Sequence, residues 1–155
     1  MMNSADTAFA GLDAWLRKAM AALEPGERQK LFREMARELR KRNQQRITRQ
    51  AGPDGQPWEP RKRNAKGRVR STAKMLIGLR AVRRMVISAD GNGAEIGYRG
   101  RNAQIAAVHH HGHVDNVAPN GPRVKYPARQ LLGLSVADLD WARARILEHL
   151  SDAMR

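Results

Sequence analysis

Four histidines between residues 109 and 113 have the clearest potential for chemistry in this sequence. They are His109, His110, His111 and His113. Imidazole binds zinc, but neighbouring residues of a helix point about 100° apart, so the four rings cannot converge on one ion. A general base would need an orienting partner, and Asp115 is the only carboxylate nearby. We therefore interpret the histidines as the polar end of a helix, with a metal site or a small histidine-metal nuclease as the less favoured alternatives.

Other signatures of enzymes are absent from the sequence. It contains no phosphate-binding loop with a following Lys-Ser/Thr pair and no G-x-S-x-G nucleophile elbow. The 15 acidic residues are scattered, without a carboxylate pair of the nuclease type. Cysteine is missing, which excludes disulfides and thiolate metal or redox sites. The sequence therefore predicts a protein that is not an enzyme, with no metal, no cofactor and no small-molecule ligand.

The charge of the chain points to a macromolecular partner. Its 29 lysines and arginines exceed its acidic residues by a formal net charge of +14. Such an excess predicts an anionic partner, with nucleic acid as the generic case, or a subunit set among acidic neighbours. An aromatic content of 5% argues against a single-strand binder built on stacking platforms. Because we find no secretory signal and no apolar run long enough to span a membrane, we expect a cytoplasmic protein without membrane contact.

Residues 50–60, with the sequence QAGPDGQPWEP, form the most distinctive segment. Pro53, Asp54 and Gly55 predict a reversal of the chain, because proline fixes φ, aspartate bonds nearby backbone and glycine accepts positive φ. Trp58 follows between two prolines, which exclude it from a regular helix or a central strand. We expect Trp58 to be a docking anchor for a neighbouring subunit on a projecting segment, and not a core residue.

A basic helix end and a basic loop surround this segment. Residues 50–72 predict a long loop or arm that becomes ordered only in an assembly, because the segment is charged and poor in apolar residues. The helix before it is expected to project from the core. The side chains that we expect to face DNA or a neighbour are Arg40, Lys41, Arg42, Arg46 and Arg49 of the helix, and Lys66, Arg68 and Arg70 of the loop.

Apolar spacing predicts a single domain of the α+β class, with an N-terminal helical hairpin, a small antiparallel sheet with a β-hairpin, and a C-terminal helix. Gly112 should cap the helix that ends at the histidines, with Ile105 and Val108 facing inward, and Ser135 with Asp138 should cap the last helix. The expected helices are 6–23, 26–49, 73–79, 102–111 and 136–153; the expected strands are 81–89 and 94–98, joined by the DGNG turn at 90–93, and 113–125 is expected to be a polar loop.

Several motifs in this order resemble the phage virion morphogenesis family, which includes tail completion proteins of P2-like and Mu-like phages. The matching motifs are LRKRNQQRITRQ (39–50), PDGQPWEPRK (53–62), MLIGLRAVRR (75–84), EIGYRG (95–100), IAAVHHHG (105–112) and YPARQLLGLS (126–135). The resemblance covers nearly the whole chain. His110 departs from it, because we expect the residue at this position to vary among polar types within the family.

The resemblance implies a structural protein of the virion neck, assembled in the host cytoplasm, that completes the head-proximal end of the tail. It implies a ring of identical subunits, expected to be a hexamer, with the tail terminator or tail tube, the head connector and the end of the packaged DNA as further partners. The expected assembly interface comprises Pro53, Asp54, Gly55, Trp58, Pro60, Arg61, Lys62, Arg63, Pro127 and Arg129.

The alternative from a different functional class is a basic nucleic-acid-binding protein that reads DNA with residues 37–49. A recognition helix normally follows a short first helix within a compact helix-turn-helix. No helix of that kind is predicted three or four residues before residue 37, so we favour the virion protein.

Overall fold

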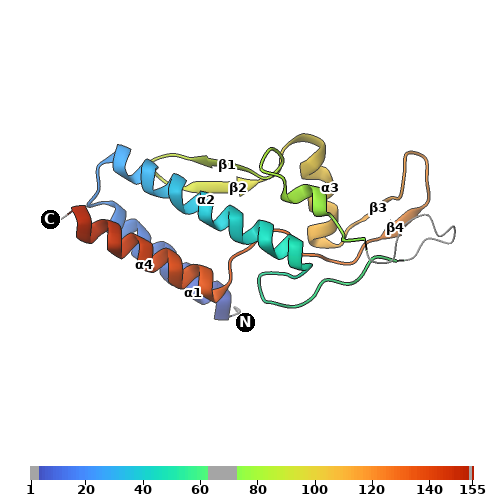
Figure 1. The fold of residues 1–155 in the computed structure, drawn as a ribbon, viewed down its shortest axis with the longest axis horizontal. Coiled ribbons are helices and arrows are strands. Elements are labelled where there is room, and N and C mark those ends of the chain that lie inside the picture. The colour runs from blue at the N-terminus through green and yellow to red at the C-terminus, as the bar shows by residue number, and fades with distance from the viewer. Residues whose placement is uncertain (1–3, 63–72, 154) are drawn as a thin grey trace. The chain divides into compact units, whose positions relative to one another are not determined.

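A computed structural model describes residues 4–62, 73–153 and 155 of the chain (Figure 1). It confirms the predicted α+β class, with N-terminal helices, antiparallel hairpins and a C-terminal helix. No helix in these ranges is long and apolar enough to cross a membrane. The elements are α1 (Ser4–Met20), α2 (Pro25–Arg49), the 3-10 helix η1 (Ile77–Arg80), β1 (Val86–Ala89), β2 (Ala94–Gly97), α3 (Gly100–His111), β3 (Val114–Asn116), β4 (Arg123–Lys125) and α4 (Val136–Ala153).

The chain divides into two compact units, each with its own hydrophobic cluster. Unit 1 comprises Met1–Leu39, Ile87–Glu95 and Leu134–Arg155, and unit 2 comprises Arg40–Val86 and Ile96–Gly133. Both units are assembled from separate stretches of sequence, so contacts between residues far apart in the chain build each core.

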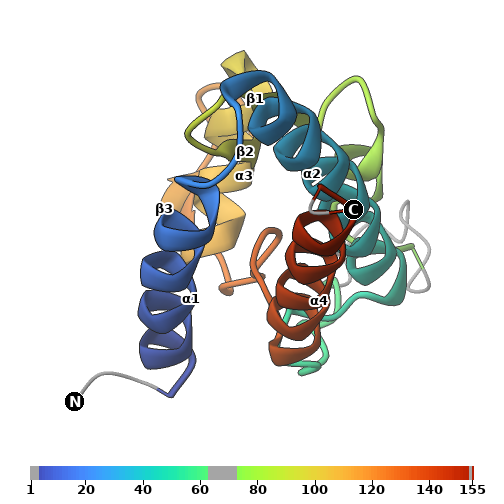
Figure 2. The ribbon, with the colours of Figure 1, turned by 90° about the vertical axis from the view of Figure 1, so that its left-hand side faces the viewer.

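The core of unit 1 is formed by α1, the first part of α2 and α4 (Figure 2). Leu139, Ala142 and Ile146 of α4 are buried, as their helical spacing predicts. On the surface, the Arg145 guanidinium lies 2.9 Å from the Glu34 carboxylate and joins α4 to α2. An exposed pair of this kind adds little stability, so apolar packing holds the unit together. The buried residues of this core are Leu31, Phe32, Met35, Ala142 and Ile146.

The start of α4 is fixed by a reciprocal capping box. The Asp138 backbone N–H donates to Ser135 Oγ at 3.0 Å, and the Ser135 N–H donates to Asp138 Oδ2 at 2.9 Å. These bonds satisfy two of the N–H groups that a helix start leaves unpaired. The predicted cap and the predicted bounds of this helix are both confirmed.

The DGNG segment forms the predicted turn between β1 and β2. Asp90 Oδ1 accepts hydrogen bonds from the N–H groups of Asn92 and Gly93, at 2.7 and 3.1 Å. Neither Gly91 nor Gly93 is among the described glycines with positive φ. An aspartate side chain that bonds the backbone two and three residues on therefore makes this turn. The strand before it begins at Val86 and not at residue 81, because Ala81 O accepts from Arg84 and Met85 in a tight turn.

In unit 2, Gly112 ends α3 as predicted, with φ of 68°. A Cβ atom at this position would lie 3.0 Å from both the Ala128 N and the Tyr126 O atoms, so the close approach of backbone also requires glycine. The expected inward face of α3 is only partly right. Ile105 is 38% exposed, whereas Ala106 is buried and faces the core.

Two further predictions for unit 2 are wrong. The expected helix at 73–79 is replaced by η1, a single 3-10 turn that begins at Ile77 and buries Leu79. The expected polar loop at 113–125 contains the β3–β4 hairpin, an antiparallel pair closed by a turn at Ala118–Gly121. Its register pairs Val114 with Lys125, Asp115 with Val124 and Asn116 with Arg123.

Candidate assembly site

The segment QAGPDGQPWEP folds back on itself just after α2. Asp54 Oδ1 accepts from the Gln56 N–H at 3.1 Å, and Gly55 has φ of 80°. Ala51 and Pro57 form an isolated antiparallel bridge, so the two arms of the turn lie side by side. The reversal predicted from proline, aspartate and glycine is therefore confirmed.

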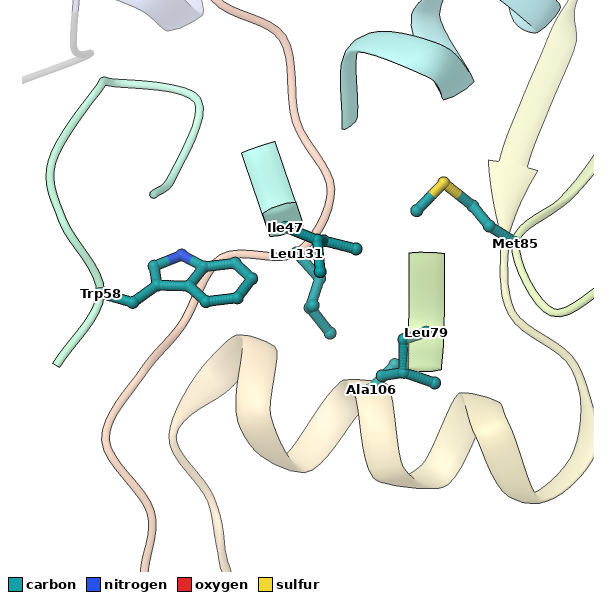
Figure 3. Packing of buried hydrophobic residues seen from close by; sticks show 6 residues of the cluster. All are labelled: Ile47, Trp58, Leu79, Met85, Ala106 and Leu131. Carbon is teal, nitrogen blue, oxygen red and sulfur yellow. The ribbon is translucent and has the colours of Figure 1, made fainter. Parts of the chain in front are cut away.

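Trp58 lies in the core of unit 2 and is only 8% exposed (Figure 3). Its backbone N–H donates to Gln50 O at 2.7 Å, which draws the tryptophan toward the end of α2. The prediction that Trp58 is not a core residue is therefore wrong. Flanking prolines exclude a helix or a central strand, but they do not prevent a loop from folding its indole inward. The buried cluster around it comprises Ile47, Leu79, Met85, Ala106 and Leu131.

The second half of α2 does not project from the core, contrary to the prediction. Ile47 is fully buried and Asn43 is 2% exposed. Asn43 Oδ1 accepts from the Gly133 N–H at 3.1 Å, and Arg46 Nη1 donates to Gly133 O at 3.1 Å. One apolar residue and one amide are enough to dock this helix end, although arginines surround them in the sequence.

The predicted basic residues therefore have different environments. Arg40 Nη1 donates to Met85 O at 3.5 Å, and Arg40 and Arg42 are half-buried. Lys41 and Arg49 are exposed to solvent. Arg63, Lys66, Arg68 and Arg70 lie outside the described residues.

Arg129 is a buried cation that joins two of the predicted motifs. Its side chain is 2% exposed, its Nε donates to Glu59 O at 3.0 Å and its Nη2 donates to Pro60 O at 3.5 Å. Burial lowers the pKa of the guanidinium, and the nearby Glu59 carboxylate opposes that shift. The YPAR motif therefore anchors the backbone that follows Trp58. We call Trp58 and Arg129 the two anchors of this segment, because both hold it to the core of unit 2 from inside. The other predicted interface residues lie nearer the surface: exposed are Asp54, Gly55, Pro60, Arg61 and Lys62, and half-buried are Pro53 and Pro127.

The histidines occupy the last turn of α3 and the residue after its cap, as interpreted from the sequence. His110 Nδ1 accepts from the Leu131 N–H at 3.3 Å, and the His109 ring meets the Tyr126 ring edge-on at 4.7 Å. His111 and His113 stack on each other with ring centroids 5.2 Å apart. Within residues 4–62, 73–153 and 155, no group of three or more His, Cys, Asp or Glu side chains is arranged to hold a metal ion.

Acidification should destabilise the folded protein through these rings. Burial is the main cause that lowers the pKa of both His109 and His110 from 6.5. At His109 the positive charge of Arg129 lowers the pKa further, and the carboxylate of Asp115 opposes the shift. At His110 the neighbouring His111 lowers the pKa further. Below pH 6.5 the unfolded chain therefore binds more protons than the folded chain, so the free energy of unfolding falls as the pH falls.

The measurement is urea unfolding at about pH 7.5 and about pH 5.5. His110→Asn is expected to show a smaller loss on acidification, because an amide oxygen can replace Nδ1 as the acceptor for Leu131 and does not titrate. An equal loss in the original protein and the variant would show that His110 does not contribute.

A second surface, which the sequence analysis did not identify, is formed by α3 and the β3–β4 hairpin. Every residue of both strands is exposed. A groove of about 390 Å³ between α3 and the hairpin is lined by Ile105, Val108, Asp115, Val117 and Tyr126, among others. We define the hairpin surface by three exposed apolar side chains, Ile105, Val117 and Val124, which are 38%, 58% and 38% exposed. Val114, which is 49% exposed, lies on the other face of the hairpin, because it pairs with Lys125 whereas Val124 pairs with Asp115.

A signal for this hairpin is present in the sequence. Asn120 and Gly121 are the Asn-Gly pair that is typical of tight turns, and Asn120 has φ of 60°. Valines stand on both sides of the pair, at 117 and 124. A two-stranded hairpin that is exposed on both faces is marginally stable in water, so this one is well suited to being covered by a partner.

Comparison with known proteins agrees with this arrangement of motifs. Residues 8–151 of the chain match the sequence pattern of the phage virion morphogenesis family. The chain belongs to this family. Tail completion protein S of Escherichia phage P2 is 36% identical over 134 residues, which cover 83% of this chain and 88% of that protein. No solved structure matches the chain.

Membership of the phage virion morphogenesis family confirms the resemblance read from the motifs. The matched residues include both anchors of the candidate site, Trp58 and Arg129, as well as the hairpin surface. The protein therefore has a structural role in building a phage virion.

Proposed function

We propose that this protein completes the head-proximal end of a phage tail and supports joining of the tail to the head. The observation that carries the proposal is the 36% identity to a tail completion protein along most of both chains. The function requires complementary surfaces and no chemical turnover, in keeping with a sequence that has no recognisable catalytic motif. Its partners would be copies of itself, the tail terminator or tail tube, the head connector and the end of the packaged DNA.

We propose a ring, with six subunits as the expected number, in which each copy covers the hairpin surface of the next. Support comes from the exposed apolar side chains of this surface and from the two strands of the hairpin, whose residues are all exposed. Burying such side chains against a neighbour stabilises both the hairpin and the contact. A contact between two different surfaces of identical subunits closes into a ring when the rotation allows it.

The exposed part of residues 53–62 is proposed as a second contact with a neighbour. Trp58 and Arg129 support this contact from beneath, since the indole fills the core and the guanidinium holds Glu59 and Pro60 by their carbonyl groups. The residues presented to a partner would be Pro53, Asp54, Gly55, Pro60, Arg61 and Lys62.

Deleting the gene from the phage that encodes the protein tests this function. The expected result is a lysate that contains filled heads and full-length tails as separate particles under negative stain. A plasmid copy should restore joined particles and the titre. Joined particles in the deletion lysate would contradict the proposal, and so would a lysate without tails, which would indicate an earlier step. The alternative, a basic nucleic-acid-binding protein that acts outside the virion, predicts no such accumulation of separate heads and tails.

A further inference from the structure

The net positive charge of the protein lies in only one of its two units. Unit 2 contains 20 lysines and arginines and three acidic residues, a net charge of +17. Unit 1 contains nine basic and 12 acidic residues, a net charge of −3. Any interaction driven by the net charge of this chain must therefore involve unit 2.

Many of these cations are free to bind a partner. Those named below are exposed, and none of them has a carboxylate partner among the described residues. Unpaired surface cations in such number create a strong local positive potential. They are Lys41, Arg49, Arg61, Lys62, Lys74, Arg80, Arg83, Arg99, Arg101, Arg123 and Lys125.

One group of these residues lines a defined groove of about 360 Å³ between α2 and η1. We call it the α2–η1 groove; its lining residues are Lys41, Gln44, Gln45, Thr48, Arg80, Ala81 and Val82. The lining contains two cations, two amides and a hydroxyl, but neither a carboxylate nor an aromatic side chain. Such a set of donors suits an anionic oxygen ligand and gives no platform on which a base could stack.

Hydrogen bonds hold the two walls of the groove together. Gln44 Nε2 donates to Arg80 O at 2.6 Å, and Arg80 Nη1 donates to Thr48 Oγ1 at 2.9 Å. Lys74, beside the groove, donates from Nζ to Thr48 O. Arg80 uses one of its five N–H donors in this way, so most of them remain available to a ligand, and the Lys41 ammonium has no bond within the described chain.

We propose that the α2–η1 groove binds the phosphate backbone of double-stranded DNA, with Lys41 and Arg80 as the phosphate contacts. Duplex DNA carries one negative charge per about 1.7 Å, whereas unit 1 of a second copy offers a net charge of only −3. DNA is therefore the better match for the charge of unit 2. Contacts to phosphate alone make the binding independent of sequence. The proposal depends on unit 2 alone and can fail without affecting the proposed tail function.

The experiment measures binding of the full-length protein to a labelled 30-base-pair duplex of mixed sequence by fluorescence anisotropy, at NaCl concentrations from 50 to 200 mM. The test variant combines Lys41→Gln with Arg80→Gln. The control variant combines Arg99→Gln with Arg101→Gln, which removes the same charge from exposed positions near the start of α3. Thermal unfolding of each variant confirms that it is folded.

Each phosphate contact contributes about 0.9 to the slope of log affinity against log salt. The slope of the test variant should therefore be smaller by about 1.8. Over this fourfold range of salt, the test variant should lose about tenfold less affinity than the original protein loses. The control variant should keep a slope close to that of the original protein. Lys41→Gln alone, which removes no hydrogen bond within the described chain, should reduce the slope by about 0.9.

Three results would overturn the proposal. The first is equal loss of slope in the test and control variants, which would mean that the charge acts without a defined site. The second is absence of binding by the original protein. The third is unchanged DNA binding by the test variant together with loss of self-association in sedimentation, which would assign the groove to a second copy of the chain.

Discussion

Replacing Trp58 with alanine is expected to lower the free energy of unfolding by about 3–5 kcal/mol, a large part of the stability of a domain of this size. The indole is 8% exposed and packs in one cluster with Ile47 and Leu131. Its removal would leave a cavity between the end of α2 and the YPARQLLGL segment. It would also release the loop at residues 50–60, since that loop has no other large side chain in the core.

Chemical unfolding of the purified variant measures this effect. Trp58→Phe is a closer comparison with the original protein, because a phenyl ring keeps much of the packing. This substitution also removes no hydrogen bond, since Trp58 Nε1 has no hydrogen-bond partner in the described part of the chain. Val82→Ala, at a position that is 58% exposed, should change stability by less than about 0.5 kcal/mol. A loss below about 1 kcal/mol for Trp58→Ala would show that the indole does not support the core and would revive its interpretation as an exposed anchor.

The second large effect is expected on assembly and not on folding. Val117→Asp combined with Val124→Asp should abolish the ring, because each carboxylate would be buried in an apolar contact at a cost of several kcal/mol. The cost recurs at each interface around the ring. In the isolated chain both positions are exposed, so the free energy of unfolding should change by less than about 1 kcal/mol.

Sedimentation velocity and the titre of the complemented deletion phage measure this effect together. A suitable control is Val136→Asp combined with Leu147→Asp, which adds two carboxylates at positions of unit 1 that are 68% and 54% exposed. The hairpin variant should lose the oligomer and lower the titre at least about a hundredfold, while the control keeps both. Normal assembly of the hairpin variant would show that the hairpin surface is not a contact between subunits.

Local signals in the sequence were sufficient for α1, α2, α3 and α4 and for one hairpin. The last helix was predicted with its bounds because Ser135 and Asp138 cap it by bonds three residues apart, and because its apolar residues recur with the helical period. The β3–β4 hairpin was missed because its strands have only three residues each and no buried face, so they show no alternation of apolar and polar residues. The Asn-Gly pair at 120–121 was the available signal.

The candidate site required contacts that no local pattern contains. Arg129 donates hydrogen bonds to the backbone carbonyl groups of Glu59 and Pro60, about 70 positions away in the sequence. Every residue type has a backbone carbonyl group, so the sequence does not indicate which residues accept these bonds. Trp58 was assigned to the surface from its flanking prolines, which describe the backbone around it and not the position of its side chain. Ile47 and Asn43 dock the end of α2 although the residues around them are mostly basic.

The most direct test of the central claim is a cryo-electron microscopy reconstruction of the neck of the joined phage particle. The account predicts several copies of this protein in a ring at the head-proximal end of the tail, with the hairpin surface of each copy covered by the next. Absence of the protein from the neck, or its presence at the distal end of the tail, would contradict the account.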